Sequence, residues 1–153
     1  MPASGITLIW LALGVERLLQ TLAFALLGGA AIWASITYTA GHRPYGYAGL
    51  GDLSVLIFFG WLGVVGTYFL QTQSLAPLVW LPATSCGLFA SDLNINNVRD
   101  IDSDRQAGKR SIPVRIGRAR AALYHWVLLS SGLLCAIVYV LLTGNRRGSF
   151  YFS

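Results

Sequence analysis

Residues 18–38 read LLQTLAFALLGGAAIWASITY, an apolar run without a single charged side chain. About 20 apolar residues in a helix span the hydrocarbon core of a bilayer, so this run predicts a transmembrane helix. The whole chain has the same character, because 55% of its 153 residues are hydrophobic and only 11% are charged. A typical soluble domain carries about a quarter charged residues. We therefore expect an all-α integral membrane protein.

Two further uncharged stretches extend the pattern. Residues 53–91 are too long for one span and suit two, with a turn at the polar residues 71–74 followed by Pro77. The apolar segment at residues 4–15 is too short to span, and we interpret it as the end of a longer helix. The chain therefore resembles a truncated transmembrane bundle in a single membrane domain. Its four expected spans lie at about 18–38, 53–70, 75–95 and 121–142, after a partial helix at 4–15.

The loops predict the orientation of these spans. Residues 99–120 contain seven bases and three acids, a net charge of +4. The positive-inside rule places this loop, residues 96–120, in the cytoplasm, and residues 39–52 must then face the same side. Arg146 and Arg147 fall on the opposite side, against the rule. Because the bases lie between apolar runs, they are expected to set topology, and no nucleic-acid partner is predicted.

The stretch that carries chemistry follows the third span directly. On a helix, Asp100 and Asp104 are i,i+4 neighbours, with Cβ atoms about 5–6 Å apart. Asn96 and Asn97 lie one turn before Asp100, which makes one polar stripe, and Asp102 points away from it. Two ionised carboxylates on one face repel each other unless a cation lies between them. Mg²⁺ suits this arrangement, since it binds one or two carboxylates together with water and phosphate oxygens.

The bases that follow suit a phosphate group. Lys109, Arg110 and Arg115 are able to neutralise phosphate oxygens, and Gly108 lets the chain turn toward the stripe. The sequence therefore predicts a magnesium–diphosphate site at the membrane surface. The spacing alone is more typical of charges that gather where a span leaves the bilayer. The adjacent asparagines favour the functional interpretation, because polar groups buried in membranes tend to be functional.

A family resemblance rests on this stretch. Residues 96–117, NNVRDIDSDRQAGKRSIPVRIG, resemble the second aspartate-rich motif of the UbiA superfamily of intramembrane prenyltransferases. Within it, the NNVRD and AGKR segments are similar to the 1,4-dihydroxy-2-naphthoate polyprenyltransferases of menaquinone and phylloquinone synthesis. Residues 38–44 (YTAGHRP), 47–52 (YAGLGD) and 66–72 (GTYFLQT) resemble the same group. Ser111 and Pro113 depart from the more usual Thr and Ala, which leaves the expected metal ligands unchanged.

The resemblance implies a bundle of nine transmembrane helices with two facing acidic motifs in a bacterial inner membrane, with the active-site loops cytoplasmic. The first motif, expected before Met1, has no match in this chain, so we expect the fragment to be inactive alone. The implied partners are a polyprenyl diphosphate, 1,4-dihydroxy-2-naphthoate and the lipid bilayer. We assign catalysis to Asp100, Asp104 and Lys109, Mg²⁺ binding to Asp100 and Asp104, and substrate binding to Asn96, Asn97, Arg43, Arg110 and Arg115.

Several alternatives stay open at this point. Arg43 contacts the diphosphate or the acceptor carboxylate, or it is an interfacial anchor. A related enzyme with 4-hydroxybenzoate, homogentisate or chlorophyllide as acceptor would use the same chemistry, although the NNVRD segment disfavours this. CDP-alcohol phosphotransfer also uses membrane-embedded aspartates, but its Asp-Gly and Ala-Arg pairs ahead of further aspartates are missing here. The non-enzymatic alternative is a non-catalytic membrane fragment.

Overall fold

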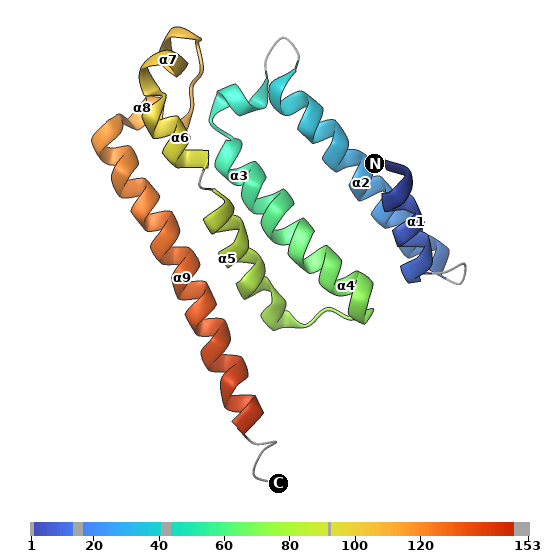
Figure 1. The fold of residues 1–153 in the computed structure, drawn as a ribbon. Helices are drawn as coiled ribbons and strands as arrows, with labels where there is room; N and C mark the ends of the chain where they lie inside the picture. Colours follow the sequence, from blue (N-terminus) through green and yellow to red (C-terminus); the bar gives the residue numbers. More distant parts are fainter. Residues whose placement is uncertain (1, 14–16, 41–43, 92, 149–153) are drawn as a thin grey trace.

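The computed structural model describes residues 2–13, 17–40, 44–91 and 93–148. All regular structure within these residues is helical, which confirms the all-α prediction. The helices follow one another along the chain with short connections (Figure 1). They are α1 (Pro2–Leu13), α2 (Leu18–Thr39), η2 (Tyr45–Ala48), α3 (Gly51–Val55), η3 (Leu56–Val65), α4 (Gly66–Thr72), η4 (Pro77–Val79), α5 (Trp80–Ala90), α6 (Leu93–Arg99), α7 (Ile101–Gln106), α8 (Ile112–Ile116) and α9 (Arg118–Gly148).

Three helices in the described part of the chain are long and apolar enough to cross a membrane, at Leu18–Thr39, Gly51–Thr72 and Arg118–Gly144. The second of these is one rod made of α3, η3 and α4, in which η3 is wound with π-helical spacing. The region 75–95, predicted as the third of four spans, has a different form. It begins with the short turn η4 and continues as the 11-residue helix α5. Pro82 fits near the start of α5, because the first turn of a helix tolerates a residue without an N–H.

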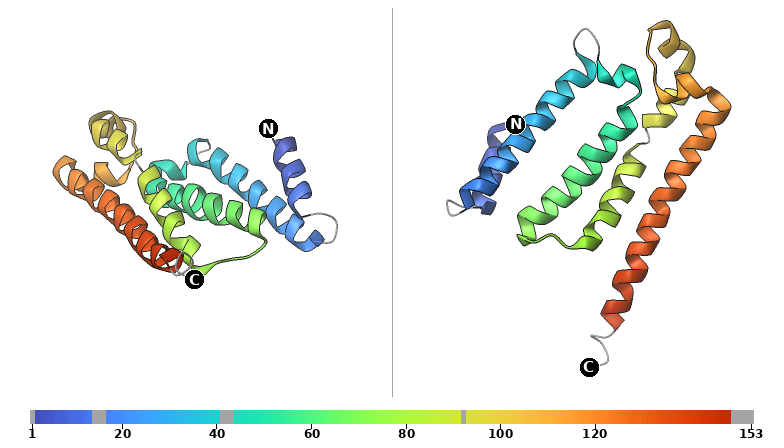
Figure 2. Two further views of the ribbon diagram at one scale, coloured as in Figure 1. Left: turned by 60° about the horizontal axis from the view of Figure 1, so that its bottom comes forward. Right: turned by 180° about the vertical axis from the view of Figure 1, so that it is seen from behind.

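The long helices stand side by side in an open row (Figures 1 and 2). Helix α5 packs between η3 and α9. Helix α2, near one end of the row, has no buried residue, and its Leu19 and Leu26 side chains are 82% and 74% exposed. Large apolar surfaces of this kind indicate contact with lipid or with other helices.

A close approach of backbones fixes the η3–α5 contact. A Cβ atom added at Gly60 would lie 2.6 Å from the carbonyl oxygen of Ala83 and 2.9 Å from the Cα of Gly87. One added at Gly87 would lie 2.9 Å from the Cα of Leu56. Small residues at a helix crossing let two backbones pack directly, which is the usual way that helices associate in lipid. On the other side of α5, the buried Ser85 hydroxyl donates a 2.8 Å hydrogen bond to the carbonyl of Gly132 in α9.

The two predicted loops, residues 39–52 and 96–120, contact each other at one end of the row. The backbone N–H of Arg110 donates to the carbonyl of Tyr47 at 2.7 Å, and Nη2 of Arg115 donates to the carbonyl of Ala48 at 2.7 Å. Gly49 has a φ of +83°, and a side chain there would also meet the carbonyl of Arg110 at 2.8 Å. The η2 turn is thereby attached to the segment that follows α7.

Candidate active site

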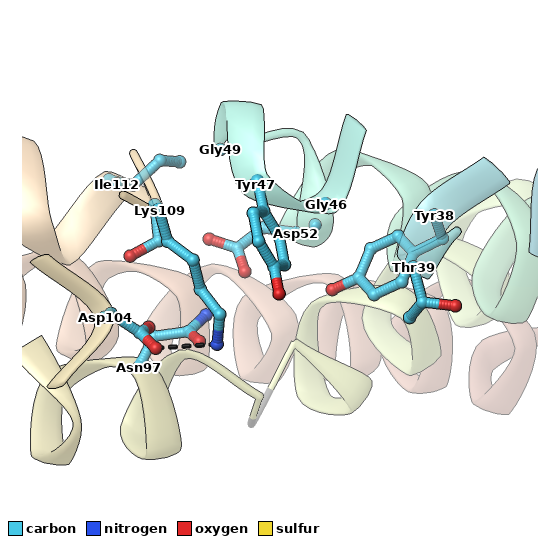
Figure 3. A pocket seen from close by; sticks show the side chains of 12 residues that line it. Tyr38, Thr39, Gly46, Tyr47, Gly49, Asp52, Asn97, Asp104, Lys109 and Ile112 are labelled. Atoms are coloured by element: carbon cyan, nitrogen blue, oxygen red, sulfur yellow. Dashed lines mark hydrogen bonds and ion pairs between the residues drawn. The ribbon is translucent and has the colours of Figure 1, made fainter. Parts of the chain in front are cut away.

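A hollow of about 240 Å³ opens where the two loops meet. Figure 3 shows Asp104, Lys109 and Asn97 on one side of it, Tyr47 and Asp52 in the middle, and Tyr38 with Thr39 on the other side. The wall therefore combines carboxylate, ammonium, amide and phenol groups. Its full lining consists of Tyr38, Thr39, Gly46, Tyr47, Gly49, Gly51, Asp52, Asn97, Asp104, Lys109, Ser111 and Ile112.

The charged side of the hollow is built by a tight turn after α7. The backbone N–H of Lys109 returns to the carbonyl of Asp104 at 2.9 Å, and Gly108 supplies the required positive φ of 73°. This turn brings Nζ of Lys109 to 2.7 Å from Oδ1 of Asp104, whose side chain is only 6% exposed. The hydrogen bond to Asp104 raises the pKa of Lys109 above its ordinary value. Lys109 is thus held as a cation, and its Nζ also lies 5.4 Å from the centroid of the Tyr47 ring.

Asp100 has a different environment from Asp104. Its two carboxylate oxygens accept hydrogen bonds from Nε and Nη2 of Arg99 at 2.8 and 3.1 Å. The hydrogen bond from Arg99 holds the pKa of Asp100 below its usual range. Asn97 and Asp104 are among the described residues that line the hollow, whereas Asp100 is not.

The stripe was predicted on one unbroken helix, and this detail is wrong. Helix α6 ends at Arg99, Asp100 has φ −95° and ψ 16°, and α7 begins at Ile101. Aspartate is a poor residue for a helix interior, because its short side chain competes with the backbone hydrogen bonds. The i,i+4 backbone bonds nevertheless persist on both sides of the break, from Asp100 to Asn96 at 2.9 Å and from Asp104 to Asp100 at 2.8 Å.

Three other predicted site residues are not among the described residues that line the hollow, namely Asn96, Arg110 and Arg115. The side chains of Asn96 and Arg110 are exposed, while the backbone of Arg110 binds the η2 turn. Arg115 is also exposed, and its guanidinium donates a hydrogen bond to the carbonyl of Ala48. Arg43 lies outside the described residues. The structure therefore brings Asn97, Asp104 and Lys109 together and gives Arg115 a loop-bridging contact.

Comparison with known proteins identifies a family for this chain. The model of the UbiA prenyltransferase family matches residues 3–153. This chain belongs to the UbiA prenyltransferase family. It is 51% identical over 137 residues to the 1,4-dihydroxy-2-naphthoate octaprenyltransferase of Escherichia coli, covering 89% of the chain and 44% of that relative. It is 52% identical over 150 residues to the enzyme of the same name from Haemophilus influenzae, covering 97% of the chain and 48% of that relative.

More distant members of the UbiA family match as well. The human UbiA prenyltransferase domain-containing protein 1 is 38% identical over 113 residues, which are 72% of this chain and 32% of that protein. The chain thus spans less than half the length of these three curated relatives. No solved structure gives a significant match.

The donor groups at the hollow fit a magnesium ion of the kind that the UbiA family implies. No three His, Cys, Asp or Glu side chains gather in the described part of the chain, so these residues do not form an all-protein cage. Mg²⁺ does not need one, because it takes one or two carboxylates and completes its shell with water and phosphate. Asp104, the neighbouring Asp100 and the Asn97 amide offer oxygen ligands. The buried Ser111 Oγ, on the same wall, has no hydrogen-bond partner among the described residues, as expected where a ligand supplies one.

Three residues of this UbiA-family site were absent from the predicted set. Tyr38 and Tyr47 line the hollow, and the Asp52 carboxylate accepts a 3.1 Å hydrogen bond from the hydroxyl of Tyr124. A weak signal existed for Asp52, because it is an isolated acid at the start of a long uncharged span. Its contact with Tyr124 joins residues 72 positions apart, which spacing along one helix does not reveal.

Proposed function

We propose that the whole protein transfers a polyprenyl group from polyprenyl diphosphate to 1,4-dihydroxy-2-naphthoate, in menaquinone biosynthesis. The observation that carries this proposal is the pair of the buried Asp104 with Lys109, which lines a hollow together with Asn97 at the membrane-proximal loops of a UbiA-family chain. The names of two relatives that match most of the chain support the choice of acceptor. We further propose that the protein lies in the bacterial inner membrane with these loops in the cytoplasm.

The residues of this chain have distinct roles in the proposed reaction. Asp104, with Asp100 and Asn97, would hold Mg²⁺, which neutralises charge on the departing diphosphate when it is bound. Lys109 is a fixed ammonium at the edge of the same site and binds diphosphate oxygens. Arg110 follows Lys109 and adds positive charge at the entrance, while Arg115 fixes the η2 turn that closes one wall.

The shape of the structure suits a substrate with a polar head and a long apolar tail. A second cavity of about 360 Å³ adjoins the hollow, and Tyr38 contributes to the lining of both. A third, apolar groove of about 560 Å³ follows between α2 and the η3–α4 rod and shares Phe58 with the second. The head group would bind between the loops while the prenyl tail follows this groove. Its apolar lining excludes water from a reactive allylic cation.

The test is an assay of the full-length protein in detergent with Mg²⁺ and a polyprenyl diphosphate. We expect prenylated product from 1,4-dihydroxy-2-naphthoate by mass spectrometry, lost when the metal is chelated. Parallel reactions with 4-hydroxybenzoate, homogentisate and chlorophyllide serve as controls. If one of these three compounds is turned over faster, it is the acceptor in place of 1,4-dihydroxy-2-naphthoate. If no acceptor is turned over, the proposed prenyltransferase activity is refuted.

A further inference from the structure

Asp52 is the second buried carboxylate in the wall of the hollow. It lies in the first turn of α3 and is 9% exposed, compared with 5% for Asp104. Burying a carboxylate is costly unless hydrogen bonds or charges compensate it. The hydroxyl of Tyr124 donates to its Oδ2 at 3.1 Å, and so attaches α3 to α9. A carboxylate accepts about four hydrogen bonds, so it binds Tyr124 and further donors at the same time.

The position of Asp52 separates it from the charged side of the hollow. Lys109, Asp104 and Asn97 form one side, and Figure 3 shows Asp52 between them and the Tyr38 ring. Tyr38 packs closely against the turn that carries Asp52, because a Cβ atom added at Gly51 would lie 3.1 Å from its hydroxyl oxygen. The part of the wall that holds Asp52 therefore also includes the aromatic side chains of Tyr38 and Tyr47.

These surroundings favour one of the two substrates over the other. A diphosphate is repelled by a carboxylate at short range, and it has a cationic partner on the Lys109 side. A hydroxylated aromatic ring presents a flat surface for Tyr38 and Tyr47 and a donor O–H for the carboxylate. A ring hydroxyl supplies such a donor, and a fully ionised diphosphate does not.

We propose that Asp52 binds a ring hydroxyl of the aromatic acceptor and orients the ring toward the prenyl diphosphate. This inference rests on the proposed function and adds the residue that selects the acceptor. Asp52 accepts a hydrogen bond from the hydroxyl, and no proton needs to leave the ring oxygen. The bond increases electron density on the ring carbon that bears the carboxylate. That carbon forms its new bond to C1 of the prenyl chain as the C1–O bond breaks and its electron pair leaves with diphosphate, and carbon dioxide then departs from the ring. Tyr124 is a positioning residue that fixes the carboxylate.

The test compares 1,4-dihydroxy-2-naphthoate with its two monomethyl ethers in the full-length wild-type protein and in Asp52→Asn. In the wild type, methylating the hydroxyl that Asp52 binds should lower kcat/KM about tenfold to a hundredfold, as for loss of a hydrogen bond to a charged group. In Asp52→Asn the same pair of acceptors should differ by less than about threefold, because the charged acceptor of the bond is gone. The KM for polyprenyl diphosphate should stay within about twofold of wild type.

Two further variants distinguish this role from others. Tyr124→Phe removes the contact between α3 and α9 but keeps the carboxylate, so it should retain most of the discrimination between acceptors. If Asp52 only anchors α9, Tyr124→Phe should reproduce the loss seen in Asp52→Asn, with the same fall in Tm. A role as a metal ligand would shift the Mg²⁺ dependence of Asp52→Asn, as in Asp104→Asn. Either result, or a wild-type protein that accepts both ethers as well as the parent compound, overturns the proposal. Failure of the proposed function itself would appear differently, as no turnover of the parent acceptor.

Discussion

The charged stretch from residue 97 to residue 112 has two faces with different environments. The inner face places Asn97, Asp104 and Lys109 at the hollow, with the Asp104 side chain 6% exposed and 2.7 Å from its lysine. On the outer face, Asp102 is 77% exposed and lies beside Arg118. Asp100, which lies beside Arg99, has an intermediate exposure of 40%. A run of acids is therefore not a site by itself. The turn at Gly108 and the contact with η2 determine which acid is buried and paired.

The largest expected effect belongs to the inner face. Asp104→Asn keeps the shape of the side chain but removes the charge that holds Lys109 and would hold the metal. We expect kcat/KM for polyprenyl diphosphate to fall about a hundredfold or more, the size of effect seen when a preorganised electrostatic contact is lost. Steady-state kinetics of the full-length protein measure it. Wild-type kinetics in this variant would show that burial at the hollow does not mark function.

The second prediction asks whether the helices beneath the loops maintain the inner face. Gly87→Leu places a side chain where a Cβ atom already meets the Leu56 backbone at 2.9 Å. Overpacking of this kind costs about 1–3 kcal/mol, so Tm should fall and both substrates should be used less well. Gly29→Leu is the matched control on α2, because nothing lies within 4 Å of a Cβ atom there. Equal effects of the two substitutions on Tm would contradict the close η3–α5 crossing.

Asp100→Asn is expected to have an intermediate effect. Asp100 is one turn from Asp104 but is bound by Arg99, so its contribution to the site should be smaller. A loss of about tenfold in kcat/KM corresponds to one weaker charge-assisted contact. The comparison with Asp104→Asn in the same assay is decisive. Equal losses would mean that both carboxylates hold the metal to the same extent and that the pairing with Arg99 is displaced when substrate binds.

Asp102→Asn should have the smallest effect. Its carboxylate lies 3.5 Å from Nη2 of Arg118 on the open surface, where ion pairs contribute little. We expect kcat/KM within about twofold of wild type, because the side chain touches neither the hollow nor the buried pair. A loss as large as that of Asp100→Asn would show that the outer face takes part in the reaction.

The sequence predicted the features that depend on local composition. The uncharged run at 18–38 corresponds to the helix at Leu18–Thr39, because hydrophobic length alone specifies such a segment. Local composition likewise predicted Asp104 and Lys109 as members of a charged motif between spans. The unequal surroundings of Asp100 and Asp104 were not predictable, because they depend on the turn at Gly108 and on the contact between Arg110 and η2. Asp52 and Tyr124 meet only because α3 and α9 are brought together by α5, which no short sequence pattern encodes.

The most direct test of the central claim is binding of inorganic diphosphate to the full-length protein in the presence of Mg²⁺, measured by calorimetry. It needs no acceptor, no prenyl tail and no turnover, so it isolates the charged side of the hollow. We expect the wild type and Asp102→Asn to bind with similar affinity and Asp104→Asn to bind at least about tenfold more weakly, since a buried charge is lost from the site. Unchanged affinity in Asp104→Asn would contradict the assignment of the Asp104–Lys109 hollow as the diphosphate site.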